Sequence, residues 1–291
     1  MSDQDLTHAL SFDIEDWFHM VEIEAVEDPS TWDDLPSIVE RETEWILDTL
    51  RERKVRATFF VLGWIADRYP DLVRSISNEG HEVSSHSFWH RRVYDLDPET
   101  FRKDLQDSLD ALHAAGVEHC PGFRAPTFSI IPGSEWAIDT LLDLGFEYDA
   151  SLFPSERQHG GYPCPPGPHR CSIAPSGRSL PELPMSIMRL AGRTTAFSGG
   201  GFFRLFPRAV IQRGFRQCEQ AGNPVVVYLH PRDFAVDTPR VPMPAIRKFK
   251  CYVGLKSARD KLRWMLDHWK FDSCAQVLKD HPGTQDPARN S

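Results

Sequence analysis

The sequence lacks the features that mark several common classes of protein. Its 291 residues carry 33 Lys and Arg against 42 Asp and Glu, a formal net charge of -9, so a basic surface for nucleic acid is missing. It contains no long uncharged apolar run, and its first residues show no basic segment followed by an apolar one. No glycine-rich phosphate-binding fingerprint follows the first predicted strand. We therefore predict a soluble cytoplasmic protein with no membrane span that does not bind nucleic acid.

Cysteine is sparse and scattered. The chain has six cysteines, none in a CxxC pair, and only Cys164 and Cys171 lie close together in the sequence. These two could form half of a zinc site, but no second pair completes it. Free thiols in a reducing compartment are the better interpretation.

What is present, over the first half of the chain, is a regular alternation of strand and helix patterns. Short apolar, β-branched or aromatic segments predict strands, and apolar residues at helical spacing predict helices of ten or more residues. Strands are expected at 8–12, 55–62, 81–86, 122–126 and 146–151, and helices at 37–53, 64–80, 98–116 and 134–145. Such alternation predicts a parallel sheet with crossover helices, either doubly wound or closed as a barrel.

The second half is less regular. Residues 154–179 are rich in Pro, Gly and Ser, which is typical of a long surface excursion such as a functional lid. Short extended pieces are expected in 180–192 and 197–207, and a buried strand at 224–230. Helices are expected at 208–222 and 254–269, and residues from about 280 onward are polar and expected to fray.

Polar residues with catalytic potential follow several of the predicted strands. In α/β sheets and barrels the carboxyl ends of the strands meet at one mouth, where the chemistry collects. The residues at these ends are Asp13, Glu15 and Asp16 in "SFDIED", His86 and His90 in "SHSFWH", Arg124 in "FRAP" and His230 in "YLHP". Two imidazoles and one carboxylate make three metal ligands and leave a coordination position open, the arrangement of a catalytic site. A second carboxylate and a further histidine could then move protons during amide hydrolysis.

The ordered set "SFDIED", "SHSFWH", "RAP", "YDAS" and "YLHP" resembles the polysaccharide deacetylase family, the NodB-homology or carbohydrate esterase family 4 hydrolases. The likeness covers residues 8–235 and is greatest to the branch found with exosortase and exopolysaccharide gene clusters, through "FDIEDWF" and "GGGFFRLFP". The resemblance implies an irregular (β/α) barrel. It also implies one catalytic domain over residues 1–280, with a core at 8–235, a helical extension at 236–280 and a flexible tail at 281–291.

The resemblance also implies roles for individual residues. It makes Asp13 the general base and His86 and His90 the metal ligands, with Arg124 orienting Asp13 and the backbone N–H of Thr127 holding the oxyanion. The third ligand would be Glu15, on the face of Asp13 if the strand continues, or Asp16 if the chain turns; alternation favours Glu15.

The remaining implied residues lie at or near the leaving group. His230 would be the general acid, and Asp149 would support the histidine from behind. Leu229 would line a pocket for the acyl methyl, with an ordinary core position as the equal alternative. Trp89 is expected in the core or at the rim, although its place between the two ligand histidines in sequence would also let it face substrate.

We therefore expect a divalent-metal hydrolase, with zinc as the metal, that removes N-acetyl groups from amino sugars of a polysaccharide or its precursor. One alternative is a catalytically degenerate barrel that binds glycans or partner enzymes. Another is an amide hydrolase or deformylase acting on a small molecule, favoured if the proline-rich segment closes the mouth. The sequence leaves the oligomeric state open.

Overall fold

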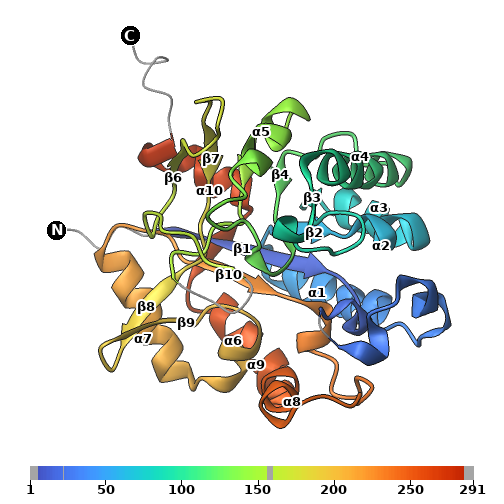
Figure 1. Cartoon of the computed structure of the whole chain (residues 1–291). Helices are drawn as coiled ribbons and strands as arrows, with labels where there is room; N and C mark the ends of the chain where they lie inside the picture. Colours follow the sequence, from blue (N-terminus) through green and yellow to red (C-terminus); the bar gives the residue numbers. More distant parts are fainter. Residues whose placement is uncertain (1–5, 22, 156–159, 285–291) are drawn as a thin grey trace.

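A curled, mainly parallel sheet forms the centre of the computed structural model, which describes residues 6–21, 23–155 and 160–284 (Figure 1). In this described part, nine strands join in one sheet with the order β10-β1-β2-β3-β4-β5-β7-β6, and β11 pairs with β1. The strands are β1 (Thr7–Ile14), β2 (Thr58–Val61), β3 (Glu82–Ser85), β4 (Gly122–Phe123), β5 (Tyr148–Asp149), β6 (His169–Cys171), β7 (Leu180–Glu182), β10 (Val226–Leu229) and β11 (Lys270–Asp272). All neighbouring pairs are parallel except β6 and β7.

Helices connect the first five strands and cover the outer face of the sheet. They are α1 (Val39–Arg53), α2 (Gly63–Arg68), α3 (Pro70–Asn78), α4 (Pro98–Ala114) and α5 (Trp136–Asp143). The single helix expected at 64–80 is two helices, because Pro70 has no backbone N–H and starts a new helix at its first position. Helix α4 begins where Asp97 caps it by accepting a hydrogen bond from the Thr100 N–H.

The second half adds a small separate sheet and five helices in the described residues. Strands β8 (Ile187–Leu190) and β9 (Arg193–Ala196) form an antiparallel pair. The helices are α6 (Gly200–Leu205), α7 (Arg208–Gln220), α8 (Ala245–Tyr252), α9 (Leu255–Leu266) and α10 (Cys274–Asp280). Short 3-10 helices lie at Trp17–His19, Glu24–Val26, Pro29–Asp34, Val93–Asp95, Pro126–Phe128, Pro231–Asp233 and Pro282–Thr284. The prediction of extended structure over 197–207 was wrong at α6, and β11 was not predicted; α10 lies within the helical extension expected over 236–280.

The core lies on both faces of β1 because its side chains alternate. Leu10, Phe12 and Ile14 belong to the large apolar cluster between the sheet and its outer helices, which also contains residues of α1, α2 and α3. Ala9 points the other way, into a smaller cluster inside the curl of the sheet. Period-two alternation therefore divides β1 into an outer apolar face and an inner face that can carry polar groups.

The architecture confirms the predicted α/β class and irregular barrel. Strands β4 and β5 contain two residues each, and among the described residues no pairing joins β6 to β10, so the curled sheet is a half-barrel. The extension predicted over 236–280 is not only helical, since β11 lies within it and pairs with β1. Of the predicted tail, residues 282–284 form a 3-10 turn and 285–291 lie outside the described residues.

Two further expectations concern membrane spans and thiols. Among the described residues, none of the helices has the length and apolar character that a membrane crossing requires. All six cysteines are free, and Cys164 and Cys171 belong to or pack against an apolar cluster.

Candidate active site

The carboxyl end of β1 carries two acidic side chains on its inner face. Asp13 and Glu15 are 3% and 2% exposed, and both line a cavity of about 950 Å³. Phe12 and Ile14 point the other way, into the outer core. The alternation expected from the sequence therefore continues one residue past the end of the strand and places both carboxylates on the same side.

Asp16 faces away from this pair and binds the start of α1 instead. Its Oδ1 accepts from the Trp17 N–H at 2.8 Å, and its Oδ2 accepts from the Ser37 hydroxyl at 2.5 Å. The same oxygen accepts from the backbone N–H groups of Ile38 and Val39 at 3.0 and 3.2 Å. Burial raises the pKa of Asp16, although these hydrogen bonds oppose the rise. With its oxygens engaged in this way, Asp16 is not among the residues that line the cavity.

The two histidines lie on a tight loop after β3. His86 continues the strand pairing through its N–H to the Val61 carbonyl at 3.0 Å. The chain then turns through Ser87 and His90, whose φ angles of 68° and 56° are in the left-handed region that favours glycine. Such geometry costs roughly 1–3 kcal/mol per residue and recurs at functional sites. The buried carboxylate of Asp104 on α4 holds the loop by accepting from the Phe88 N–H at 2.7 Å.

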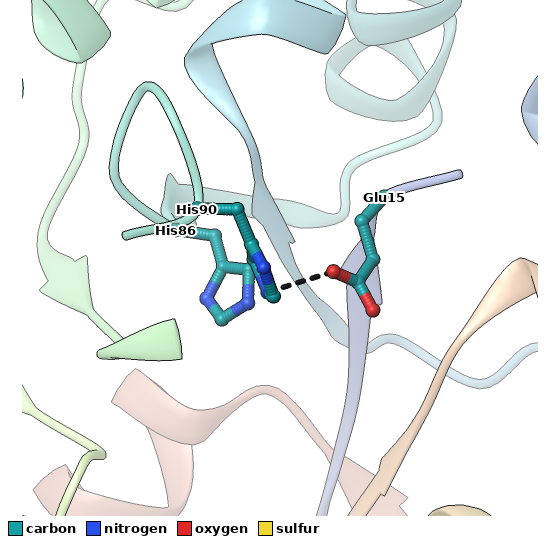
Figure 2. A group of neighbouring side chains, drawn as sticks. All are labelled: Glu15, His86 and His90. Atoms are coloured by element: carbon teal, nitrogen blue, oxygen red, sulfur yellow. Dashed lines mark ion pairs between the residues drawn. The ribbon is translucent and has the colours of Figure 1, made fainter. Parts of the chain in front are cut away.

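Glu15, His86 and His90 bring their donor atoms together at the mouth of the sheet. One atom from each lies within 4.8 Å of the others, and Figure 2 shows the side chains pointing toward a common point. His90 Nε2 is 2.7 Å from Glu15 Oε2. The three come from two different strand ends, more than 70 residues apart in sequence. This is the ligand group that the resemblance implied, with Glu15, the carboxylate that alternation favoured, as its third member.

The chemistry of these three residues fits a divalent metal. His86 Nδ1 contacts the Arg124 carbonyl at 2.8 Å; a carbonyl only accepts, so Nδ1 carries the proton and Nε2 keeps its lone pair. Burial lowers the pKa of His86 to about 4, which keeps the imidazole neutral as a ligand must be. Burial raises the pKa of Glu15, but the charges of His90 and Arg232 outweigh it and hold the carboxyl ionised. Glu15 Oε2 contacts His90 Nε2, and within the described chain His90 Nδ1 is buried without a hydrogen-bond partner.

Arg124 fixes the other carboxylate of β1. Its Nη1 donates to Asp13 Oδ1 at 2.7 Å and to the Ser11 hydroxyl at 2.8 Å, and its Nε donates to the Ala150 carbonyl at 3.3 Å. The guanidinium is fully buried and lies 4.0 Å from the centre of the Phe60 ring. An ion pair in this dry setting fixes the orientation of Asp13, and the other carboxylate oxygen remains available toward the cavity.

His230 follows β10 and faces the two carboxylates. Its Nε2 lies 3.8 Å from Asp13 Oδ2 and 3.7 Å from Glu15 Oε1. Its Nδ1 donates to Asp233 Oδ2 at 3.1 Å, and Arg204 of α6 donates to Asp233 Oδ1 at 2.7 Å. Burial raises the pKa of Asp233, but Arg204 and His230 outweigh it, and the net shift is downward. Asp233 and Arg204 therefore direct Nε2 of His230 into the cavity.

A further cation reaches the site from the same turn. The Nη2 atom of Arg232 is 3.5 Å from Glu15 Oε1, and the side chain is 28% exposed on the cavity wall. Sequence reasoning missed Arg232, Asp233 and Arg204. Arg204 lies in "GGGFFRLFP", and Arg232 and Asp233 directly follow "YLHP". The available signal was the acidic residue three positions after His230.

Three of the predicted substrate-binding residues do not line the cavity. Leu229 is fully buried on the outer face of β10, because side chains alternate and Tyr228 and His230 take the inner face. Trp89 packs against the outer core between Phe88 and Trp32. Asp149 is buried against the Ser151 hydroxyl, 2.5 Å from its Oδ1, and does not contact His230; Asp233 takes the place predicted for it.

Thr127 lines the cavity, as expected. It lies in a 3-10 turn after β4 with φ of 56°, and Phe128 follows with φ of 59°. Gly160 lies against this turn so closely that a Cβ there would meet the carbonyl oxygens of Phe128 and Thr127 at 2.3 and 2.9 Å. The described part of the proline-rich segment thus braces the turn from behind, and residues 160–179 do not line the cavity.

Comparison with known proteins matches two segments of the chain to family models. Residues 30–147, which contain the histidine loop, Arg124 and Thr127, match the model named Polysaccharide deacetylase. The chain carries a domain of the polysaccharide deacetylase family. Residues 150–279, which contain His230 and Asp233, match a domain of unknown function, DUF3473. Asp13 and Glu15 precede both matched segments.

Curated relatives of this deacetylase domain match it over part of their length. The chain is 32% identical over 124 residues to a peptidoglycan-N-acetylglucosamine deacetylase of Bacillus cereus, covering 38% of this chain and 44% of that protein. It is 33% identical over 109 residues to a chitooligosaccharide deacetylase of Rhizobium leguminosarum bv. trifolii, covering 33% and 51%. The chain thus spans about half the length of these relatives.

Solved structures share the fold of the whole chain. A Mycobacterium smegmatis protein assigned as a polysaccharide deacetylase aligns with a TM-score of 0.64 at 22% identity, covering 96% of this chain and 90% of that one. The Puue allantoinase aligns with a TM-score of 0.61 at 14% identity, covering 97% and 93%. At these identities the likeness concerns the fold, and it confirms the deacetylase-type half-barrel.

Proposed function

We propose that the protein is a metal-dependent hydrolase that removes N-acetyl groups from amino sugars of a polysaccharide or its precursor. The observation that carries this is the convergence of Asp13, His230 and the Glu15–His86–His90 group on one cavity. The set contains ligands for a metal, a separate carboxylate and a separate imidazole, which are the groups that amide hydrolysis requires.

Glu15, His86 and His90 would hold the metal, with zinc the proposed ion. Two neutral imidazoles and one carboxylate form a common ligand set for catalytic zinc. When bound, the ion would polarise the acetamide carbonyl and acidify a water. The three ligands line the cavity and are at least nine-tenths buried, so substrate would reach the metal through the cavity.

Asp13 and His230 would move the protons. Asp13 is held by Arg124 and would take the proton from the attacking water as general base. His230 is directed by Asp233 and would donate a proton to the amine nitrogen as the acetyl group leaves. The backbone N–H of Thr127, at the cavity wall, would stabilise the oxyanion. Arg232 adds a positive charge beside Glu15 and is suited to attract a carboxylate or phosphate on the substrate.

The substrate class rests on the relatives and on the size of the cavity. The two curated relatives above are named for acetylated amino sugars of peptidoglycan and of chitooligosaccharides. A cavity of about 950 Å³ is large enough for a few sugar units and lies at the upper end of the range typical of small-molecule sites. We therefore propose an N-acetylated saccharide, reached in the cytoplasm, as the substrate.

Acetate release tests this function. The purified protein, loaded with zinc, should release acetate from N-acetylglucosamine oligomers and lose this activity when a chelator removes the metal. His86→Ala and His90→Ala should each remove the metal and the activity. His113→Ala is the matched control, because this histidine is exposed on α4 and should change neither.

The same experiment separates the alternatives. A protein that binds the oligomers without releasing acetate would be a degenerate glycan-binding barrel. Release of an acyl group from small amides or formamides, with none from the oligomers, would indicate a small-molecule amide hydrolase. Full metal content in both histidine variants would remove the metal assignment itself.

A further inference from the structure

Large apolar side chains that remain exposed gather at the mouth of the cavity. Among the described residues, four such side chains are strongly exposed: Leu205 (42%), Val236 (47%), Ile246 (74%) and Phe249 (56%). Leu205, Ile246 and Phe249 line the cavity mouth, whereas Val236 lies elsewhere. Ile246 and Phe249 are three residues apart on α8, so they share a face of the helix.

Helix α8 has no fully buried side chain. None of its residues from Ala245 to Tyr252 is buried, and it lies at the lower margin of the molecule in Figure 1, beside α6 and α9. An amphipathic helix normally packs its apolar side into a core. Here Ile246 and Phe249, the most exposed large apolar residues of the described chain, are solvent-exposed and line the cavity.

The segment that contains α8 is strongly basic in an acidic protein. Between Asp237 and Asp260 the sequence has six basic residues and no acidic one: Arg240, Arg247, Lys248, Lys250, Lys256 and Arg259. Lys248 and Lys250 are exposed and flank Phe249 directly. The whole chain has a net charge of -9, so this local charge runs against the average.

We propose that α8 and Leu205 form a docking face for an anionic lipid membrane. Apolar side chains on one face of a helix with lysines beside them are the pattern of helices that lie in the membrane interface. Ile246, Phe249 and Leu205 would enter the headgroup boundary, and Lys248 and Lys250 would contact anionic headgroups. The face is small, so binding is weak and reversible.

This docking would place the cavity mouth at the lipid surface. The three apolar residues line the opening to Asp13 and the Glu15–His86–His90 group, so the saccharide that enters would be one held at a membrane. The inference does not depend on turnover, because docking is measured without substrate. If the protein releases no acetate, vesicle binding can still be tested, and if it binds no vesicles, acetate release can still be tested.

Flotation of the full chain with lipid vesicles is the experiment. The protein should float with vesicles of phosphatidylcholine and phosphatidylglycerol, remain in solution with phosphatidylcholine alone, and dissociate as salt is raised. The double change Ile246→Ser with Phe249→Ser should weaken vesicle binding by ~tenfold or more. Lys248→Gln and Lys250→Gln should each weaken it about fivefold.

Matched controls make the result specific. Val236→Ser removes an apolar side chain of similar exposure away from the mouth, and Lys279→Gln removes an exposed lysine on α10; both should bind as the unchanged protein does. Phe249→Trp keeps an apolar ring and should also retain binding. Far-ultraviolet circular dichroism confirms that each variant folds.

Four results would overturn the proposal. The first is no flotation with anionic vesicles, and the second is equal loss in the Val236 and Lys279 controls. The third is that the protein forms a dimer, does not bind vesicles, and becomes a monomer when Ile246→Ser and Phe249→Ser are combined. The fourth is salt-sensitive binding to a soluble anionic polysaccharide with none to vesicles, which would make the basic segment a glycan site.

Discussion

Exchanging Glu15 and Asp16 separately for their amides should separate metal binding from folding. Both carboxylates are buried and adjacent in the sequence, yet they face different partners. Glu15 Oε2 lies 2.7 Å from His90 Nε2, and Glu15 belongs to the group of ligand atoms with His86 and His90. Asp16 instead accepts hydrogen bonds at the start of α1 from Ser37, Ile38 and Val39. Glu15→Gln should therefore weaken metal binding, whereas Asp16→Asn should weaken the fold.

The size of each effect follows from these contacts. Glu15→Gln removes the charge of one proposed metal ligand; changes to groups that only support a ligand already cost 10- to 100-fold in affinity. We expect metal binding to weaken by at least ~100-fold, or about 2.8 kcal/mol. In Asp16→Asn one carboxylate oxygen becomes an amide NH₂, which cannot accept a hydrogen bond. The N–H and O–H groups that donated to that oxygen lose their acceptor, which costs about 1–3 kcal/mol of stability. Its metal affinity should not change.

Calorimetric titration with zinc and unfolding in denaturant measure the two quantities. In chelator, Asp16→Asn should unfold at lower denaturant than the unchanged protein. Zinc should stabilise Asp16→Asn normally, but it should no longer stabilise Glu15→Gln, because ligand binding stabilises only a fold that can bind it. Loss of zinc affinity in Asp16→Asn with normal affinity in Glu15→Gln would refute the reasoning and move the third ligand to Asp16.

Three further predictions concern the proton-transfer groups and a buried carboxyl pair. Asp13→Asn should lower acetate release by ~100-fold or more while zinc titration still shows tight binding, since a general base contributes roughly that factor; unchanged activity would exclude the role. His230→Ala should lower kcat by ~100-fold with metal content intact, and Asp233→Asn should lower kcat less with KM nearly unchanged, because it only orients the imidazole; a metal loss in either variant would contradict this. Burial raises the pKa of Asp149 to about 6, above the ~3.9 of an unfolded chain, so the folded state retains a proton that the unfolded state loses. Stability should then fall as pH rises from about 4 to 6, by at most ~1.4 kcal/mol per unit. Asp149→Asn, which removes the titrating group, should flatten that slope in denaturant titrations at each pH, and an unchanged slope would contradict the raised pKa. Burial and the charge of Asp149 also raise the pKa of the neighbouring Glu182, which therefore contributes with the same sign.

The sequence was sufficient for the architecture because its signals were local. Alternation of short apolar strands with amphipathic helices predicted the parallel sheet, and the strand-end rule placed Asp13, His86 and His230 at one mouth. The break of the 64–80 helix at Pro70 could also be predicted, since proline lacks the N–H that an uninterrupted helix uses there. The helix α6 could not be, because glycine-rich segments have weak local preference and packing decides their conformation.

Side-chain partners in the site were harder to predict. The position of Leu229 in the cavity was wrong, because period-two alternation from His230 directs its side chain outward. The resemblance implied Asp149 as the support of His230, but Asp233, three residues after the histidine, occupies that position. Arg204 comes from a helix distant in sequence, and only the fold shows that it holds Asp233. The cytoplasmic location and the association with exopolysaccharide genes stay predictions.

The most direct test of the account is acetate release by the same protein sample with and without metal. The zinc-loaded protein should release acetate from N-acetylglucosamine oligomers, lose the activity on chelation, and regain it when zinc is restored. Asp13→Asn, loaded with zinc to the same content, should stay inactive throughout. Acetate release that persists in the chelated protein, or no release from any N-acetylated saccharide by the fully loaded protein, would contradict a metal-dependent deacetylase built from these residues.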